Sequence, residues 1–288
     1  MKELVVISGK GGTGKTSVAA SLAVLSARAV IADCDVDAAD MHLVLKPQAT
    51  QNHPFDSGNL AVIRPDKCTG CGLCLENCRF GAVKEPAPGE TSYHIVPEAC
   101  EGCGVCVRLC PAGAIDFPER HCGQWMTSET RCGTMVHAKL AVAAENSGKL
   151  VSIVRSNARM LALEQGKDTI IVDGPPGIGC PVIASITGAW KVLVVTEPTV
   201  SGEHDLMRVL SLAGHFRVPA AVCVNKWDIN PEMTERIEDK ARQAGAVVAG
   251  RIRYDRMFTK AQIQGKAVVE TDAPSAGDIK TIWANLDL

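Results

Sequence analysis

Short apolar runs alternate along most of the chain with longer stretches in which apolar residues recur at helical spacing. The runs are nearly continuous, as expected of parallel strands that helices cover on both faces. They predict strands over residues 4–8, 30–33, 150–155, 169–173, 192–196, 220–225 and 247–249. The periodic stretches predict helices over residues 15–27, 134–146, 157–165, 178–189, 202–216, 231–244, 257–264 and 275–286. This alternation predicts an α/β fold with a doubly wound, mostly parallel sheet.

A cysteine-rich segment interrupts this pattern. It includes the turn-forming sequence Pro86-Ala87-Pro88-Gly89 and has too little apolar area to fold alone without a metal. We therefore expect a small domain over residues 62–117, inserted between a first part (1–61) and a second part (118–288) of one α/β domain.

Eight of the cysteines form two runs with the same internal spacing, Cys68-x-x-Cys71-x-x-Cys74-x-x-x-Cys78 and Cys100-x-x-Cys103-x-x-Cys106-x-x-x-Cys110-Pro111. Paired Cys-x-x-Cys motifs also occur in zinc sites, but triplets followed by a fourth cysteine fit a four-ligand zinc site poorly. The runs therefore favour iron-sulfur clusters.

The spacing resembles that of two-cluster bacterial ferredoxins, in which the fourth cysteine of each run ligates the other cluster. The resemblance implies a ferredoxin-like insert with two [4Fe-4S] clusters, one held by Cys68, Cys71, Cys74 and Cys110, and the other by Cys100, Cys103, Cys106 and Cys78. The first run departs from the pattern, because Arg79 stands where a proline usually follows the fourth cysteine.

A phosphate-binding loop follows the first predicted strand and precedes the first predicted helix. It fits the G-x-x-x-x-G-K-[ST] pattern and reads Gly9, Lys10, Gly11, Gly12, Thr13, Gly14, Lys15, Thr16. Backbone N–H groups of such a loop surround phosphates, Lys15 reaches the β and γ oxygens, and Thr16 ligates Mg²⁺. A Gly-rich turn without chemistry is the alternative, and the order of strand, loop and helix argues against it.

Lys10 makes this loop more specific, since an early lysine resembles the deviant Walker A ATPases, which include MinD, ParA, Mrp-type carriers and the nitrogenase iron protein. The resemblance implies a homodimer in which Lys10 reaches the partner's nucleotide. It also implies that Asp35 orients the attacking water, that Asp33 lies near the Mg²⁺, and that Asp173 holds Mg²⁺ through water. The Gly177 N–H is then expected to sense the γ-phosphate.

The choice of base stays open at this point. Asn225-Lys226-Trp227-Asp228 follows a predicted strand and matches the N-K-x-D element that selects guanine. In the resembling family, an asparagine at this place contacts adenine. We favour ATP, with Asn225 as a nucleotide-binding residue, because Lys10 is typical of that family.

Composition limits the possible partners. A net charge of -2 and a pI near 6.4 give no global attraction to nucleic acid or anionic membranes. No signal peptide is visible, so 13 cysteines indicate the reducing cytoplasm rather than disulfides. The apolar stripe of Ile279, Ile282, Trp283 and Leu286 is more typical of core than of a membrane anchor. We expect a cytoplasmic protein.

Two cysteines outside the runs suggest a further site. Cys180 follows Asp173 by seven residues, as a cluster-ligating cysteine does in the nitrogenase iron protein, and Cys132 could be its partner at a dimer axis. The seven histidines form no metal-like pair, and His137, on a predicted helix, is expected to be structural.

Three functional hypotheses follow from these residues and resemblances. The first is an ATP-hydrolysing iron-sulfur protein whose dimer switching serves iron-sulfur or metal-cofactor assembly on a partner metalloprotein or apo-protein. The second is an ATP-gated electron donor that resembles the nitrogenase iron protein. The third is a positioning ATPase of the MinD or ParA kind with structural clusters.

Overall fold

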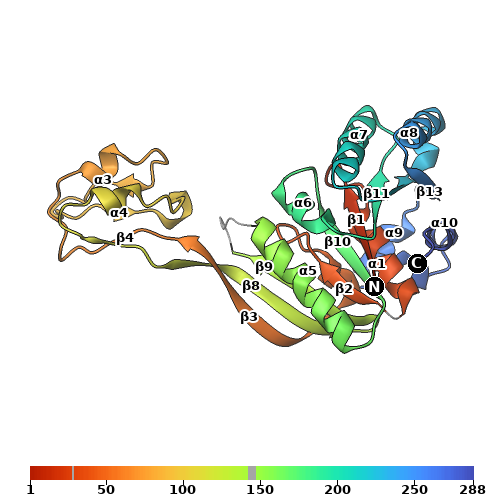
Figure 1. The fold of residues 1–288 in the computed structure, drawn as a ribbon, viewed down its shortest axis with the longest axis horizontal. Helices are drawn as coiled ribbons and strands as arrows, with labels where there is room; N and C mark the ends of the chain where they lie inside the picture. The colour runs from red at the N-terminus through yellow and green to blue at the C-terminus, as the bar shows by residue number, and fades with distance from the viewer. Residues whose placement is uncertain (28, 142–146) are drawn as a thin grey trace. The chain divides into compact units, whose positions relative to one another are not determined.

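The computed structural model describes residues 1–27, 29–141 and 147–288, which separate into two compact units (Figure 1). The larger unit contains Met1–His53, Trp125–Lys139 and Ser147–Leu288. The smaller unit contains Pro54–Gln124 with Leu140 and Ala141. It therefore includes, besides the segment 62–117, the ends of three strands that begin or continue in the larger unit.

Within the described residues, one nine-stranded sheet has the order β13-β12-β11-β1-β10-β2-β9-β8-β3. The strands are β1 (Lys2–Ser8), β2 (Val30–Asp33), β3 (Gln48–Asn59), β8 (Glu119–Thr130), β9 (Gly133–Leu140), β10 (Thr169–Pro176), β11 (Lys191–Thr196), β12 (Ala220–Asn225) and β13 (Val247–Ile252). Neighbouring strands from β13 to β9 are parallel. Only Arg131 and Cys132 join β8 to β9, so these two strands form an antiparallel hairpin. The sheet is mixed and mostly parallel, which confirms the predicted fold class.

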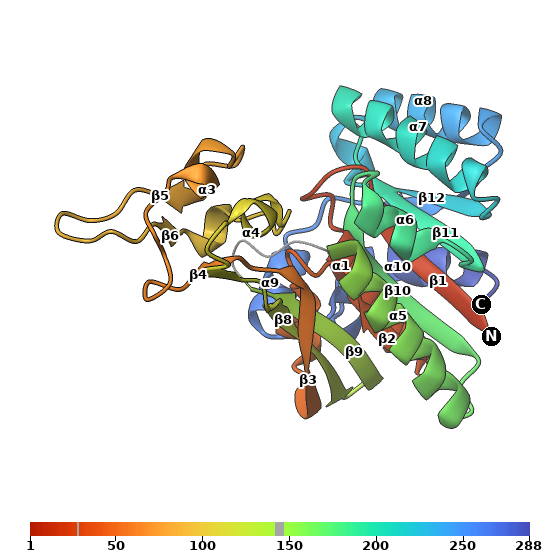
Figure 2. The same cartoon turned by 60° about the vertical axis from the view of Figure 1, so that its left-hand side comes forward.

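Helices cover both faces of this sheet. They are α1 (Lys15–Ser26), α2 (Met41–Leu45), α5 (Ser147–Glu164), α6 (Cys180–Ile186), α7 (Val200–His215), α8 (Pro231–Gln243), α9 (Met257–Ile263) and α10 (Pro274–Asn285). Helices α1, α2 and α10 share one core with the sheet, and α5, α6, α7 and α8 lie on the other face (Figure 2). Leu4, Val5, Val6 and Ile7 are all fully buried because β1 is covered on both sides.

Two predicted elements are wrong. Residues 150–155, predicted as a strand, lie inside α5, and residues 134–140, predicted as the start of a helix, form β9. The rest of that predicted helix, residues 142–146, lies outside the described residues. His137 therefore lies on a strand and not on a helix. On this strand it is buried and hydrogen-bonded to Ser128.

Both errors have physical causes. Leu150, Val151, Val154 and Ala158 are buried at helical spacing, so the apolar run was part of a longer amphipathic helix. Residues 135–137 pair with β2, with Met135 beside Ile31, and this tertiary pairing outweighs local preference.

The smaller unit is built around the cysteine runs. Its short elements are β4 (Val62–Ile63), α3 (Leu73–Glu76), β5 (Val83–Lys84), β6 (His94–Ile95), α4 (Val105–Leu109) and β7 (Ile115–Asp116). Its core contains Ala61, Ile63, Cys74, Val83 and Ile115, and other run cysteines pack against them. The helices α3 and α4 each begin after a glycine with positive φ, Gly72 (80°) and Gly104 (71°), which a larger residue would strain.

A buried ion-pair network connects α5 to β1. The Glu3 carboxylate accepts hydrogen bonds from Arg155 Nε at 2.6 Å and from Arg159 Nε at 2.8 Å. Arg155 also donates to the carbonyls of Ala184 and Thr187 near the end of α6. Glu3 and Arg155 are each about 5% exposed, so either charge would be costly without its partner.

We expect Arg155→Met to destabilise the folded protein by about 3–5 kcal/mol, because it leaves a buried carboxylate with only its half-exposed partner Arg159. Arg159→Met should cost less than half as much, since that side chain is 39% exposed. Urea unfolding of the two variants checks this, and equal losses would contradict it.

Candidate functional site

A cavity of about 500 Å³ opens where β1, β2 and β12 end. It is lined by six residues of the predicted phosphate loop, namely Gly11, Gly12, Thr13, Gly14, Lys15 and Thr16. Asp35 lines it from the segment after β2, and Asn225 lines it from the end of β12. Ligands of open α/β sheets bind at the carboxyl ends of the strands, and this cavity lies in that place.

The loop between β1 and α1 requires its glycines. Gly12 and Gly14 have φ of 80° and 86°, and a Cβ on Gly14 would come within 2.5 Å of Asn225 Nδ2. The same Nδ2 donates a hydrogen bond of 2.8 Å to the carbonyl of Thr13. Asn225 therefore holds the phosphate loop in place from the neighbouring part of the sheet.

Lys15 connects two of the predicted acidic residues. Its Nζ lies 2.6 Å from Asp173 Oδ1 and 3.1 Å from Asp35 Oδ2, and it also reaches Thr16 Oγ1 at 3.3 Å. Burial acts to lower the pKa of Lys15, but the carboxylates of Asp173 and Asp35 outweigh burial and raise it. The lysine is thus charged, and it faces more negative charge than it can neutralise.

Asp33 adds a third carboxylate beside Asp173 on the neighbouring strand. It is fully buried, and burial together with Asp173 raises the pKa of Asp33 well above its usual range. Oδ2 of Asp33 and Oδ2 of Asp173 are both buried without a hydrogen-bond partner. Oxygen ligands and excess negative charge suit Mg²⁺, so these residues and Thr16 fit the ion.

Removing this buried carboxylate should stabilise the metal-free protein. An unfolded Asp titrates near about 3.9, so above that pH the unfolded chain releases a proton that folded Asp33 retains. Stability therefore falls as pH rises from about 3.9 to the raised pKa of folded Asp33. We expect Asp33→Asn, in EDTA, to be about 1–3 kcal/mol more stable than wild type at pH 7 and to lose this advantage near pH 4.

Urea unfolding at the two pH values checks this expectation. The other carboxylates titrate alike in the two proteins, so only Asp33 should make their difference in unfolding free energy depend on pH. The same difference at both pH values would contradict the expectation.

Two other glycines of the predicted nucleotide site lie outside the cavity lining. Gly9 packs against α7, where a Cβ would come within 2.4 Å of Asp205 Cβ. The Gly177 N–H, expected to sense a γ-phosphate, donates 2.8 Å to the carbonyl of Ser8. Gly177 is thus held against the end of β1 in this structure.

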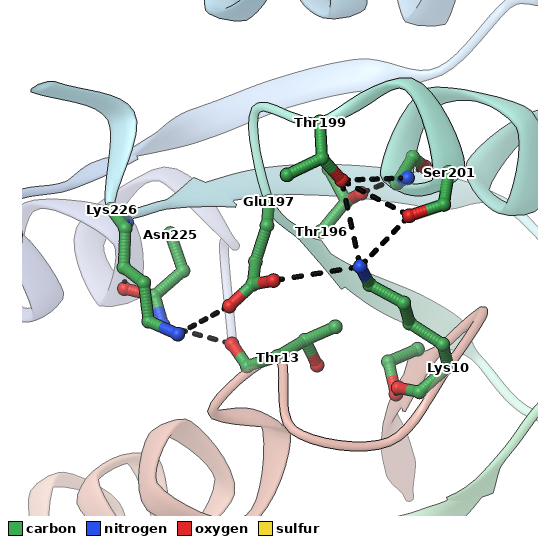
Figure 3. A network of polar contacts seen from close by, with 10 residues as sticks. Lys10, Thr13, Thr196, Glu197, Thr199, Ser201, Asn225 and Lys226 are labelled. Atoms are coloured by element: carbon green, nitrogen blue, oxygen red, sulfur yellow. Dashed lines mark hydrogen bonds and ion pairs between the residues drawn. The ribbon is translucent and has the colours of Figure 1, made fainter. Parts of the chain in front are cut away.

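Lys10 does not line the cavity either. Its Nζ lies 3.0 Å from Ser201 Oγ, 3.5 Å from Thr199 Oγ1 and 3.7 Å from Glu197 Oε2, as Figure 3 shows. The other oxygen of Glu197 pairs with Lys226. In this single chain, Lys10 is therefore held by the segment that begins α7.

The loop after β13 lines the cavity and was missed by sequence reasoning. It contributes Arg253, Tyr254, Asp255 and Arg256. These polar residues follow the carboxyl end of a parallel strand. Residues at such a position often bind ligands, so their position could have marked them as candidates. Asp228 of the N-K-x-D element does not line the cavity, and its Oδ1 accepts a 2.6 Å hydrogen bond from the Tyr254 N–H. Asp228 therefore positions this loop.

Four cysteines from both runs line one small cavity in the smaller unit. A cavity of about 20 Å³ is lined by Cys68, Cys71, Cys74 and Cys110, together with Tyr93. This is the set implied for one cluster, including the fourth cysteine of the other run.

Hydrogen-bond donors surround several of the sulfurs. The N–H of Ala114 donates to Cys110 Sγ at 3.3 Å. Burial acts to raise the pKa of the Cys68 thiol, but N–H groups of Gly70 and Tyr93 outweigh it and lower the pKa. The pKa of Cys78 is lowered against its burial in the same way, by N–H groups that include Val83 and Phe80. Thiolates so supported suit an iron-sulfur cluster.

The second implied set is Cys100, Cys103, Cys106 and Cys78. Burial, followed by the neighbouring charge of Cys100, raises the pKa of Cys106, and Cys103 acts in the same direction. Among the described residues, no three His, Cys, Asp or Glu side chains converge closely enough to hold a single metal ion.

The structure does not bring Cys132 and Cys180 together. Cys132 lies in the turn before β9, next to Gly133, whose Cα faces the Ala29 carbonyl just before β2. Cys180 begins α6, after the carboxyl end of β10. Because β2, β9 and β10 are parallel, Cys132 lies at the amino ends of these strands and Cys180 lies at their carboxyl ends.

The C-terminal stripe belongs to the core, as expected. Ile279, Ile282 and Leu286 are fully buried, and Trp283 is partly buried and packs against the same core. None of the described helices is long and apolar enough to cross a membrane.

Comparisons with known proteins agree with the fold and the phosphate loop. Residues 4–268 match the family described as the CobQ/CobB/MinD/ParA nucleotide binding domain. An uncharacterized protein of Methanocaldococcus jannaschii, MJ0578, is 34% identical over 232 residues, which cover 79% of each chain.

Two solved structures share the fold over nearly the whole chain. The cell division ATPase MinD of Pyrococcus furiosus is 17% identical, with a TM-score of 0.59 and 99% and 98% of the two chains covered. The septum site-determining protein MinD of Pyrococcus horikoshii, complexed with Mg-ADP, is 16% identical, with a TM-score of 0.60 and coverage of 99% and 96%.

Proposed function

Because the chain belongs to the CobQ/CobB/MinD/ParA nucleotide-binding family, we propose that it is an iron-sulfur ATPase that serves metal-cofactor assembly on a partner protein. It hydrolyses ATP with Mg²⁺ as a homodimer, and the nucleotide cycle changes how an inserted two-cluster domain acts on that partner. The partner is a metalloprotein or apo-protein that receives iron-sulfur or another metal cofactor.

The nucleotide chemistry belongs to the residues around Lys15. Lys15 and the loop N–H groups bind the phosphates, while Thr16, Asp33 and Asp173 hold Mg²⁺. Asp35 orients the attacking water, and the Gly177 N–H leaves the Ser8 carbonyl to bind the γ-phosphate. The pairing of Lys15 with Asp173 and Asp35 supports this assignment, because nucleotide and Mg²⁺ would replace both ion pairs.

Lys10 is proposed to reach the nucleotide of the partner subunit in the dimer. Its exposed contacts with Glu197 and Ser201 would then be exchanged for phosphate oxygens. Asn225 is proposed to face adenine, and the engagement of Asp228 by the Tyr254 N–H supports ATP over GTP.

The observation that carries the iron-sulfur assignment is the cavity lined by Cys68, Cys71, Cys74 and Cys110. A [4Fe-4S] cluster bound there would accept and donate single electrons. The matching set of Cys100, Cys103, Cys106 and Cys78 would hold the second cluster. Both sets lie in one compact unit, inserted between the parts of the ATPase domain.

A second candidate function is an ATP-gated electron donor. Cys71 and Cys103 are exposed, so one edge of each cluster would lie at the surface, where a partner can approach. A third is a positioning ATPase with structural clusters, and the shared fold with the cell division ATPase MinD supports it.

Anaerobic purification, followed by metal and sulfide analysis, tests the proposal. We expect about eight iron and eight sulfide per chain, from two [4Fe-4S] clusters. Stoichiometric zinc without sulfide would overturn the iron-sulfur assignment.

A chelator experiment separates the candidate functions. Faster transfer of iron to bathophenanthroline with Mg-ATP than without it supports cofactor assembly. Clusters that are retained but reduce a viologen dye only with Mg-ATP favour the electron donor, and clusters indifferent to Mg-ATP in both assays favour the positioning ATPase.

A further inference from the structure

A row of polar side chains crosses three neighbouring strands beside the nucleotide cavity. Asp173 of β10 lies next to Asp33 of β2, and Asp33 lies next to His137 of β9. Two residues earlier on these strands, Ile171, Ile31 and Met135 all belong to the core that contains α1. Because side chains alternate along a strand, the three polar residues lie on this same face. His137 thus extends the acidic site by one strand.

His137 is tied in turn to β8. Its Nε2 lies 2.7 Å from Ser128 Oγ, and Ser128 is fully buried while His137 is only 9% exposed. A buried hydrogen bond between neighbouring strands is costly to break, because neither group could find water. A displacement of Asp33 on nucleotide binding would therefore reach β8 through β9.

Strand β8 is unbroken from Thr130 back to Glu119, where it belongs to the smaller unit (Figure 1). Within that unit, Arg120 NH1 donates 3.3 Å to the carbonyl of Cys100. The carbonyl of Asn59, at the end of β3, lies against Gly102, where a Cβ would come within 2.4 Å. The ends of β8 and β3 thus both contact the start of the second cysteine run, at Cys100 and Gly102.

The first run is not held by these strands in the same way. The cavity of Cys68, Cys71 and Cys74 is bounded by Ile63 and Ile115 of the short strands β4 and β7. Arg64, after β4, donates 2.6 Å to the carbonyl of Gly113, which lies between Cys110 and β7. Arg64 and Arg120 therefore each donate a hydrogen bond to a backbone carbonyl, but Arg64 belongs to neither β8 nor β3.

We propose that His137 and Ser128 transmit the nucleotide state of the ATPase site to β8, and that β8 passes it to the second cysteine run rather than to the first. The proposal rests on the ATPase function proposed above. It makes the site of Cys100, Cys103 and Cys106 the one that responds to nucleotide.

Hydrogen exchange of the full chain tests this, because the backbone reports motion independently of iron content. Exchange in peptides covering residues 100–106 and 68–74 is compared with and without Mg-AMP-PNP. The variants are Ser128→Ala and Arg120→Gln, with Arg64→Gln as the matched control. Ser128→Thr, which keeps the hydroxyl, serves as the rescue variant.

We expect Mg-AMP-PNP to change exchange over residues 100–106 in wild type, Arg64→Gln and Ser128→Thr. This nucleotide-dependent difference should be lost in Ser128→Ala and Arg120→Gln, while residues 68–74 show none in any protein. No difference in wild type, the same difference in all five proteins, or failure of the threonine rescue would overturn the proposal.

Iron and sulfide are measured on the same samples, so the two proposals can fail separately. A nucleotide-dependent difference in a protein without sulfide would refute the iron-sulfur function and leave the transmission path intact. Two intact clusters with no nucleotide-dependent difference would refute the path alone.

Discussion

Replacement of Lys15 by glutamine is expected to reduce the kcat for ATP hydrolysis by about 10²–10³. Lys15 is 6% exposed and is the cation that contacts Asp173 and Asp35, at 2.6 and 3.1 Å. Glutamine has a shorter, polar side chain and loses the charge that stabilises the β and γ oxygens in the transition state. Steady-state phosphate release with Mg-ATP measures the effect.

Lys226→Gln is the matched control, because Lys226 lines the same cavity but pairs with Glu197 instead of Asp173 and Asp35. We expect it to lose less than about tenfold, since its charge lies away from the phosphates. Circular dichroism of Lys15→Gln checks that it folds. Equal losses in the two folded variants would show that Lys15 has no special place in the chemistry.

Replacement of Cys110 by serine is expected to remove the cluster of the other run. Cys110 lines the cavity with Cys68, Cys71 and Cys74, so its loss leaves that set one ligand short. Iron should fall from about eight to about four per chain. Alkylation followed by mass spectrometry should then modify the three first-run cysteines and leave Cys100 and its cluster protected.

Cys180→Ser is the control, because Cys180 is exposed in the larger unit and should not change the iron content. If Cys110→Ser instead exposes Cys100, Cys103 and Cys106 to alkylation, each run binds its own cluster and the crossed ligation is wrong.

Local sequence predicted the parts of the molecule that local sequence determines. The phosphate loop is specified by glycines with positive φ between a buried strand and a helix, and the structure forms it there. The cavity lined by Cys110 with Cys68, Cys71 and Cys74 contains one of the sets that the resemblance to ferredoxins implies. Strands with a short apolar run, such as residues 4–7 of β1 and 30–32 of β2, were found because helices bury both of their faces.

The missed strands β3, β8 and β9 depend on tertiary pairing, whereas the error at residues 150–155 came from an apolar run that belongs to a longer amphipathic helix. β3 and β8 carry many polar residues and so lack the apolar run of a central strand. β9 is a strand because it lies beside β2, which its own sequence does not specify. The present contacts of Lys10 with Ser201 and of Gly177 with Ser8 are set by neighbouring segments, so no spacing rule could predict them.

We propose that the ATPase site acts on iron-sulfur clusters in the insert. The most direct test is the EPR spectrum of the anaerobically purified, dithionite-reduced protein, with midpoint potentials recorded with and without Mg-ATP. We predict the signals of reduced [4Fe-4S] clusters and a change in spectrum or potential with Mg-ATP that Lys15→Gln abolishes. Absence of cluster signals, or intact signals that Mg-ATP leaves unchanged, would contradict the claim.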